Sequence, residues 1–353
     1  MSKSRSNSIN LAVVVPFFNE GLGAPAFLDR VRQALAAIEK DGSIDLDWRV
    51  ICVNDGSSDE TLPALLQARR IEPRIAVIDL SRNFGKEYAL TAGLDHADAD
   101  VVVTMDGDGQ HPPEMMGAML EAWRQGNEVV YMVREARDVR GLHRLLRNLF
   151  YWLFALASRT KLPPEAGDFR LMDRRVVAAI RQLPERTRFL KGIYSWVGFH
   201  QIGLQYREDA RMQGRSHWRL SRLLAFAMDA LSAFSTLPLR IWSWIGAAVA
   251  GLSLLYGAWR VVRAIFWGID VPGFETIVVS ITFLGGMQLL SLGVLGSYIG
   301  RIFEEVKARP LYIVRRCYGL SEGVPEAASE TGPNPAWSAP ARQSSPVPFK
   351  GRS

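Results

Sequence analysis

The N-terminal part of the chain alternates short apolar runs with stretches whose apolar side chains recur at helical spacing. Phe27, Val31, Leu35 and Ile38 recur every three or four residues, which places them on one face of a helix. A further helix is expected from Lys86 to about residue 97. Strands are expected in the apolar, β-branched runs at 11–15, 50–53, 75–80, 101–105 and 129–133. This alternation predicts an α/β fold with a doubly wound sheet, whose ligands gather at the carboxyl ends of the strands.

The later part of the chain contains long runs without any charged residue. Two such runs, 241–259 and 276–300, are each close to the ~20 residues with which a helix spans a bilayer. They could be buried helices of a soluble domain, but the Trp and Tyr side chains near their ends are typical of membrane interfaces. Before them, the apolar positions from Leu220 to Phe234 keep helical spacing, which predicts an amphipathic helix lying in the membrane interface.

The distribution of charge indicates which partners the chain binds and how it is oriented in the membrane. The 353 residues carry a formal net charge of +6, which favours anionic partners such as nucleic acid, phosphate ligands or acidic lipid. The two apolar runs would form a transmembrane hairpin. By the positive-inside rule, the basic residues between 301 and 316 place both ends of this hairpin, and the N-terminal domain, in the cytosol. Arg260 and Arg263 weaken this contrast. We therefore expect a multi-pass protein of the plasma or inner membrane with a cytosolic catalytic domain.

These patterns divide the chain into five expected segments. They are a catalytic α/β domain at 1–215, a juxtamembrane amphipathic helix at 216–238, a transmembrane hairpin at 239–300 (helices at about 241–262 and 276–299), a basic cytosolic segment at 301–320 and a disordered tail at 321–353. The two cysteines, Cys52 and Cys317, do not have metal-ligand spacing. Because Cys52 lies in an apolar run, we expect it to be a buried thiol.

The clearest candidate for chemistry follows the strand at 101–105. Asp106 and Asp108 stand one residue apart at the end of that strand, and Gly107 and Gly109 allow the backbone to turn. Two carboxylates that close repel each other unless a cation or a shared proton compensates. A hard divalent ion does so by taking carboxylate oxygens, and it leaves sites for phosphate oxygens. The alternative is an acidic β-turn, which Asp-Gly pairs also favour.

Further candidate ligand-binding residues follow the other predicted strands, whose carboxyl ends lie at the same edge of the sheet. Asp55 could hydrogen-bond a base or a ribose, or serve only in a turn. Lys86 and Arg82 could hold phosphate, or mark the solvated start of a helix. Arginines crowd residues 134–147 beside the apolar run 149–156, which suits an amphiphile with an anionic head and an apolar tail. A solvated helix face near anionic lipid is the alternative for these arginines.

Five motifs together carry a resemblance to a known family. They are Val-Val-Val-Pro-Phe-Phe-Asn-Glu (13–20), Val-Asn-Asp-Gly-Ser-Ser-Asp (53–59), Ser-Arg-Asn-Phe-Gly-Lys-Glu (81–87), Met-Asp-Gly-Asp-Gly-Gln-His-Pro-Pro-Glu (105–114) and Gly-Asp-Phe-Arg-Leu (167–171). The set resembles the GT-A glycosyltransferases of family 2 over about residues 10 to 316. More narrowly, it is similar to the polyprenyl-phosphate glycosyltransferases, which include dolichol-phosphate mannose synthases and bactoprenol glucosyltransferases.

The resemblance implies roles for individual residues. The nucleotide would be bound by Pro16, Asn19, Glu20 and Asp55, together with Lys86 and Asp106. The metal, Mg²⁺ or Mn²⁺, would be held by Asp106, Asp108 and Gln110. The catalytic residues would be Asp108 and Asp168, of which Asp168 matches the family's active-site acid. The phosphate of the acceptor would be bound by Arg134, Arg137, Arg144 and Arg147, and by Arg215 of a second basic cluster.

Two departures from the family pattern are visible. Gly107 and Gly109 stand where alanine and leucine are common, which should loosen the metal loop slightly. His217 stands where the family usually has lysine, so the charge of that juxtamembrane contact differs.

We therefore expect a metal-dependent, inverting transfer of a sugar from a UDP- or GDP-linked donor to an undecaprenyl or dolichyl phosphate at the cytosolic membrane face. The expected partners are the nucleotide sugar, the polyprenyl phosphate and the bilayer, with a possible homo-oligomer and without nucleic acid. One alternative is a processive polysaccharide synthase, for which a Gln-x-x-Arg-Trp stretch and further membrane spans are missing. A second alternative is a non-enzymatic membrane anchor that retains the fold.

Overall fold

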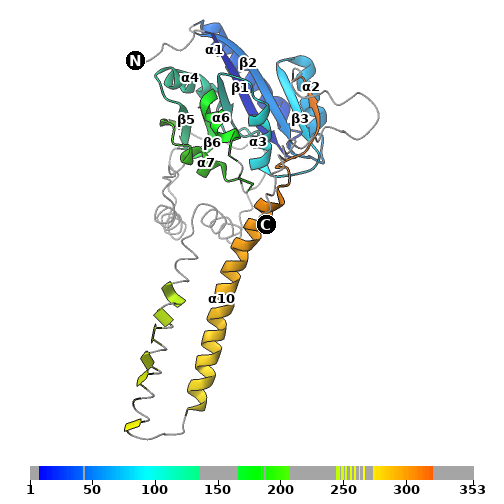
Figure 1. Ribbon diagram of the computed structural model, residues 1–353. Helices are drawn as coiled ribbons and strands as arrows, with labels where there is room; N and C mark the ends of the chain where they lie inside the picture. The colour runs from blue at the N-terminus through cyan, green and yellow to red at the C-terminus, as the bar shows by residue number, and fades with distance from the viewer. Residues whose placement is uncertain are drawn as a thin grey trace, which may run out of the picture.

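The computed structural model shows a mixed sheet flanked by helices, from which one long helix extends (Figure 1). It describes residues 8–42, 44–134, 166–183, 185–186, 188–206 and 273–320, together with isolated helical residues between 244 and 266. Several sequence predictions lie outside the described residues. They are the amphipathic helix at 216–238, the tail at 321–353, His217 and the arginines Arg137, Arg144, Arg147 and Arg215.

The strands and helices of the described residues alternate over most of the N-terminal domain. The strands are β1 (Ser8–Phe17), β2 (Asp45–Asn54), β3 (Ile75–Leu80), β4 (Val101–Thr104), β5 (Val129–Arg134), β6 (Ala166–Asp173), β7 (Gln201–Tyr206) and β8 (Val314–Tyr318). The helices are α1 (Ala24–Asp41), α2 (Thr61–Ile71), α3 (Lys86–His96), the short 3₁₀ helix η1 (Pro113–Met115), α4 (Met116–Arg124), α6 (Arg174–Arg181), α7 (Leu190–Trp196) and α10 (Phe274–Lys307).

The strands form one sheet in the order β7-β5-β6-β4-β1-β2-β3-β8. Its centre, β4-β1-β2-β3, is parallel, and the prediction of a doubly wound α/β layout is confirmed there. The whole sheet is mixed, because β6 runs antiparallel to β4 and β5, and β8 runs antiparallel to β3. The strands β6, β7 and β8 were not predicted from the sequence pattern.

The alternation of side chains along β1 explains why helices cover both faces of the sheet. Leu11, Val13 and Val15 are buried in a core cluster with residues of α1, α2 and α4. The intervening Ala12 and Val14 lie in a second cluster with residues of α3, α6 and α7. Strands buried on both faces are apolar throughout, which is why these runs lack an alternating pattern in the sequence. Cys52 is fully buried in the first cluster, as expected.

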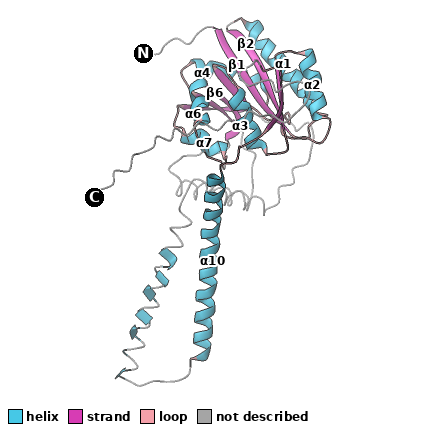
Figure 2. Ribbon diagram, turned by 45° about the vertical axis from the view of Figure 1, so that its right-hand side comes forward, coloured by secondary structure: helices cyan, strands magenta, loops and turns pink. Residues whose placement is uncertain are grey.

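α10 extends from the domain as a 34-residue helix and contains the whole of the second predicted span (Figure 2). Within the described residues, one helical stretch, Phe283–Lys307, is long and apolar enough to cross a membrane. The described residues between 244 and 266 are helical and run alongside α10 in both views, and the two-helix hairpin stays a prediction.

After α10 the chain returns to the sheet. Arg186, in the loop after α6, donates its backbone N–H to Glu305 Oε1 at 2.8 Å, and its guanidinium donates to the carbonyl of Arg309. β8 then pairs with β3, so the residues after the long helix form the outermost strand beside the parallel centre.

Candidate active site

The loops that follow β1 and β2 are joined by hydrogen bonds between backbone and short polar side chains. The Asn19 N–H donates to Ser57 Oγ at 3.0 Å, and Asn19 Oδ1 accepts from the Ser58 N–H at 2.9 Å. Glu20 donates its N–H to Thr61 Oγ1 at 2.9 Å. Asn19 has a φ of +55°, a conformation that asparagine tolerates better than most residues. These contacts hold the predicted nucleotide residues Asn19 and Glu20 at the carboxyl edge of the sheet.

Asp55 connects the loop after β2 to the loop after β3. Its carboxylate accepts from the N–H groups of Phe84 at 2.7 Å and Gly85 at 2.9 Å, and the residue is 2% exposed. Burial raises the pKa of Asp55, and the two backbone N–H groups oppose that shift. Both oxygens therefore brace the neighbouring loop, a role the sequence did not indicate. Contact of Asp55 with a nucleotide stays a prediction.

The turn that carries Asp106 is supported by a buried histidine. His111 Nδ1 accepts from the Asp106 N–H at 3.0 Å, and its ring stacks on Phe169 with centroids 5.2 Å apart. His111 is 3% exposed, and burial lowers its pKa, so the ring is neutral and can accept this bond. Asp108 Oδ1 accepts from the Gln110 N–H at 3.1 Å, which closes the turn.

Gly107 packs closely against the first strand. A Cβ at this position would lie 2.6 Å from the buried ring of Phe17 and 3.1 Å from the carbonyl oxygen of Pro16. Gly109 has a φ of +77°, in the left-handed region that favours glycine. The loosening expected from these two glycines is therefore not what the geometry indicates, because Gly107 allows the loop to approach β1 more closely than alanine would.

A cluster of opposite charges lies where β4 ends and β6 begins. Lys86 Nζ is 2.6 Å from Asp106 Oδ1 and 2.5 Å from Asp168 Oδ2. Because β6 runs antiparallel to β4, its first residues meet the last residues of β4, and Thr104 Oγ1 donates to the Asp168 carbonyl at 2.6 Å. The predicted residues Lys86, Asp106 and Asp168 thus come together from three distant segments.

The charges of this cluster shift one another's pKa values. Burial raises the pKa of Asp168, but Lys86 and then Lys191 lower it more, to about 2. Partial burial lowers the pKa of Lys86, while Asp106 and Asp168 together raise it above its usual value. Glu87 has a pKa of about 7, because burial and the charge of Asp168 both raise it. Near neutral pH the cluster therefore holds an ionised Asp168, a charged Lys86 and a half-protonated Glu87.

Asp168 retains one oxygen that can receive a ligand. Within the described part of the chain, its buried Oδ1 accepts no hydrogen bond. Arg170, which is 1% exposed, donates from Nε to the Gly167 carbonyl at 3.0 Å and places its guanidinium 4.7 Å from the centroid of the Tyr194 ring. Arg170 and Tyr194 were not predicted as site residues, although the Gly-Asp-Phe-Arg stretch that contains Arg170 was a signal for this region.

The residues predicted to hold a metal offer oxygen donors, which fit a hard divalent cation. Asp106 already faces one cation, the ammonium of Lys86, and Asp108 and Gln110 belong to the same short turn. The residues that the structure describes do not contain a group of three or more His, Cys, Asp or Glu side chains suited to a metal. Asp106, Asp108 and Gln110 would therefore hold such an ion together with water or ligand oxygens.

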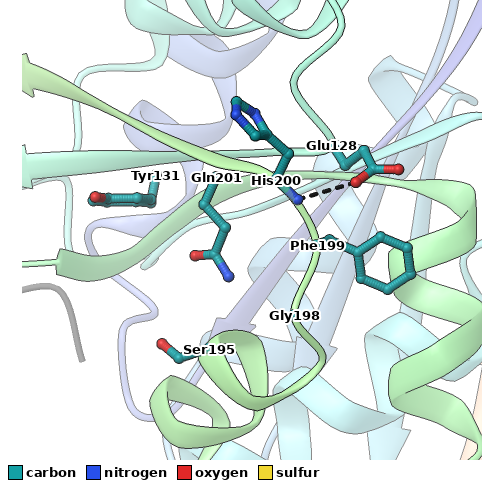
Figure 3. Close-up of a pocket in the computed structure, with 7 residues that line it drawn as sticks. All are labelled: Glu128, Tyr131, Ser195, Gly198, Phe199, His200 and Gln201. Atoms are coloured by element: carbon teal, nitrogen blue, oxygen red, sulfur yellow. Dashed lines mark hydrogen bonds between the residues drawn. The ribbon is translucent and has the colours of Figure 1, made fainter. Parts of the chain in front are cut away.

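The predicted acceptor residues are described only in part. Arg134 ends β5 and is exposed, while the other four arginines lie outside the described residues. A separate cavity of about 640 Å³ lies beside β5 and β7 (Figure 3). It is lined by Glu128, Tyr131, Ser195, Gly198, Phe199, His200 and Gln201, none of which was predicted as a site residue.

Comparison with known proteins places this geometry in a family. Residues 12–181 match the profile of Glycosyl transferase family 2, and residues 237–302 match the GtrB C-terminal hairpin. An uncharacterized glycosyltransferase of Synechocystis is 42% identical over 89% of this chain and 97% of its own length. Bactoprenol glucosyl transferase of Shigella phage SfII is 41% identical over 88% of this chain and 99% of its own.

A solved structure, glucosyl-3-phosphoglycerate synthase from Mycobacterium tuberculosis, aligns with a TM-score of 0.43 and 19% identity, over 62% of this chain and 75% of that chain. The sequence relationships extend from the first strand through the long helix. The chain is a glycosyltransferase, and it belongs to glycosyltransferase family 2.

Proposed function

We propose that this enzyme transfers a sugar from a nucleotide sugar to the phosphate of a polyprenyl phosphate at the cytosolic membrane face, with inversion at the anomeric carbon. The observation that carries the proposal is the cluster of Lys86, Asp106 and Asp168 at the carboxyl edge of the sheet. The name of the Shigella phage SfII relative, a bactoprenol glucosyl transferase, supports a polyprenyl acceptor, and the matching GtrB hairpin supports an association with membrane.

The proposed reaction exchanges one carbon–oxygen bond for another. An oxygen of the acceptor phosphate attacks the anomeric carbon, and the bond from that carbon to the nucleoside diphosphate breaks, with its electron pair leaving on the diphosphate. A phosphate monoester has its second pKa at about 6, so the attacking oxygen is already anionic near neutral pH. The reaction therefore needs orientation and exclusion of water more than a strong base.

This requirement agrees with the ionisation of Asp168. Since its pKa is about 2, Asp168 is a weak base and cannot act as an acid near neutral pH. Its charge and its buried Oδ1 suit the orientation of a sugar hydroxyl, or the stabilisation of positive charge that develops at the anomeric carbon. Lys86 is placed to meet the negative charge of the leaving diphosphate, which requires it to turn away from one of its two carboxylates.

Asp106, Asp108 and Gln110 would hold Mg²⁺ or Mn²⁺ in this account. The ion, when bound, would neutralise charge on the leaving diphosphate. Asn19, Glu20 and Pro16 would contact the nucleotide from the braced loops, and Arg134 would contact the acceptor phosphate with the arginines that follow it. We also propose that residues 239–300 form a transmembrane hairpin with both ends in the cytosol.

A lipid-extraction assay tests the function. The purified enzyme in detergent is incubated with polyprenyl phosphate and each of a panel of radiolabelled UDP- and GDP-sugars, and the organic phase is counted. We expect label in the lipid for at least one donor, its loss in excess chelator, and its loss in Asp108→Asn. Label in a polymer instead would favour a polysaccharide synthase. Absence of transfer or donor hydrolysis with every sugar would favour a non-enzymatic anchor.

Substitution of Arg134 tests the acceptor assignment in the same assay. A charge-assisted contact to phosphate is worth about 1.5–3 kcal/mol, or roughly tenfold to a hundredfold in binding. Arg134→Ala should raise the KM for polyprenyl phosphate by about that factor and leave the KM for the donor unchanged. Arg124→Ala, at the exposed end of α4, removes the same charge elsewhere and serves as the control. Equal effects of the two variants would remove Arg134 from the acceptor site.

A further inference from the structure

Arg315 belongs to β8, the strand that follows the long helix, and it reaches the loops on the nucleotide side of the sheet. β8 pairs with β3 through a register shift, with Arg316 opposite Asp79 and Val314 opposite Leu80. Arg315 is the extra residue at this irregularity. Such a bulge leaves one residue out of the ladder and redirects its side chain.

The redirected guanidinium contacts a residue of β3 and the residue that directly follows this strand. Arg315 Nη1 lies 3.6 Å from Asp79 Oδ2, and Arg315 Nη2 donates to the Ser81 carbonyl at 2.6 Å. The side chain of Asp79 is 3% exposed. A carboxylate this buried needs a compensating charge, because removing it from water is costly. Within the described residues, Arg315 is the cation that pairs with it.

Hydrogen bonds connect Asp79 to the loop after β2. Its Oδ1 accepts from Asn54 Nδ2 at 2.7 Å, and Asn54 Oδ1 accepts from the Ser57 N–H at 3.3 Å. Ser57 Oγ in turn accepts from the N–H of Asn19. A continuous chain of polar contacts therefore leads from Arg315 to the loop after β1.

The contact with Ser81 connects Arg315 to a second loop, the one after β3. Ser81 begins the loop that leads to Lys86, and the N–H groups of Phe84 and Gly85 in that loop donate to Asp55. Arg315 thus holds both loops that carry predicted nucleotide and phosphate residues, although it follows Ser81, in the nearer of these loops in sequence, by 234 residues.

We infer that Arg315 is a positioning residue for the donor: the strand after the membrane helix fixes the loops that receive the nucleotide. The inference rests on the proposed function for the identity of the ligand, but the ordering of the loops by Arg315 does not. Arg315 does not contact the reacting atoms, so it should affect donor binding far more than the rate at saturation.

The test compares Arg315→Ala with Arg316→Ala in the full-length protein. Both variants remove one positive charge from the same strand, and Arg316 has no ion pair in the part of the chain that the structure describes. Binding of UDP and of GDP, each with Mg²⁺, is measured by titration calorimetry. Changes along such a network alter coupling enough to weaken binding about threefold to thirtyfold, which is the loss we expect for Arg315→Ala alone.

Four further readouts separate positioning from general damage. The donor KM should rise with the Kd, while kcat and the acceptor KM change less than about twofold. Arg315→Lys should recover part of the loss, because lysine can pair with Asp79 but lacks the second nitrogen that donates to the Ser81 carbonyl. Amide hydrogen exchange should become faster at residues 54–59 and 81–86 in Arg315→Ala. In an Asp79→Asn background, where the buried charge is absent, Arg315→Ala should have a smaller further effect, confined to the 81–86 loop that the Ser81 contact holds.

Unchanged exchange in both loops, or equal effects of the two alanine variants, would overturn the inference. If Arg315→Ala does not fold, the Asp79→Asn/Arg315→Ala double variant decides: a folded double variant with restored nucleotide binding supports the pairing, and one that remains unfolded contradicts it. If wild-type protein binds neither nucleotide, the proposed donor site fails, whereas the exchange experiment still decides whether Arg315 orders the loops.

Discussion

The braced loops after β1 and β2 and the charged cluster around Lys86 share one edge of the sheet, but they are held in different ways. Asn19, Glu20 and their partners are joined by backbone N–H groups and neutral or short polar side chains. The cluster is joined by charges, with Lys86 between Asp106 and Asp168. Hydrogen bonds of the first kind give a fixed shape, whereas the balance of charges in the second changes whenever a charged ligand arrives.

This difference suggests that the two regions have separate functions. Under the proposed function, the loops would give the nucleotide a preformed surface, and Lys86 would turn from a carboxylate towards the diphosphate during the reaction. Fixed donors and acceptors reduce the cost of ordering a ligand. A cluster of opposed charges keeps Asp168 ionised, as its pKa of about 2 indicates. The predictions below separate the two kinds of region.

Removal of Lys86 should have the largest effect on stability. In Lys86→Met, two carboxylates lose their cation, and loss of one partner of a buried pair costs about 3–5 kcal/mol. The Lys86 side chain is 42% exposed, so water screens part of this and we expect a loss of about 2–3 kcal/mol at pH 7. Chemical denaturation measures it, and Lys40→Met, in the last turn of α1, is the control.

The pH dependence of that loss follows from Asp168. Its pKa is lowered from 3.8 to about 2 in the folded enzyme, so its pairing contributes stability above about pH 4, and this contribution disappears as the pH falls towards 2. The difference between Lys86→Met and wild type should therefore shrink in acid. A difference that is the same at pH 3 and pH 7 would contradict the pairing.

Glu87→Gln should have a smaller effect, with the opposite dependence on pH. The folded pKa of Glu87 is about 7, above its ordinary 4.5, so the folded enzyme binds the proton more tightly and loses stability as the pH rises from about 4.5 to 7. The loss attributable to Glu87 between pH 5 and 8 should be about 2 kcal/mol, or about 4–8 °C in apparent Tm. In Glu87→Gln this part of the decline should be absent, and an unchanged slope would show that another group titrates.

Thr61→Val should have the smallest effect, and this effect should shrink only in acid, where Asp59 becomes protonated. Burial raises the pKa of Asp59, but hydrogen bonds, that of the Thr61 hydroxyl first, lower it more. Thr61 Oγ1 accepts from the Glu20 N–H and donates to Asp59 Oδ1 at 2.5 Å, and valine has nearly the same shape without the hydroxyl. Loss of a typical hydrogen bond costs about 1 kcal/mol. A similar loss is expected here because Thr61 is buried but its partners are not, Glu20 being half-buried and Asp59 exposed, so that water can replace the lost contacts. A loss above about 3 kcal/mol would place the braced loops among the strongly stabilising parts of the molecule.

The two regions also differ in how far the sequence predicted them. The strands that end at Phe17, Asn54 and Leu80 are apolar runs followed by polar loops, so their edge and its candidate residues could be read from local pattern. Asp168 could be identified only by family resemblance, because its proximity to Asp106 depends on β6 returning antiparallel to β4. A strand of eight residues that includes Asp, Arg and Gly does not have a clear strand pattern.

The roles of Asp55, His111 and Arg315 show a second limit of prediction from sequence. The sequence left Asp55 open between a ligand contact and a turn, and it did not show that the two oxygens of Asp55 accept from the backbone of a loop thirty residues away. His111 supports the Asp106 turn through a single ring nitrogen, and Arg315 acts from a strand that follows the long helix. Such contacts depend on register and on bulges, which local propensity does not encode.

The most direct test of the account is single-turnover sugar transfer by Asp168→Asn, measured beside equilibrium binding of the nucleoside diphosphate. The enzyme is saturated with donor and acceptor, so that the rate reports the chemical step. Asparagine keeps the shape of the side chain but removes the charge opposite Lys86. The account predicts that transfer slows at least about a hundredfold, the lower end of what an electrostatic or acid–base group contributes, while nucleotide binding changes less than about threefold. An unchanged rate of transfer, or a loss of nucleotide binding as large as the loss of rate, would contradict the assignment of the Lys86, Asp106 and Asp168 cluster as the reacting centre.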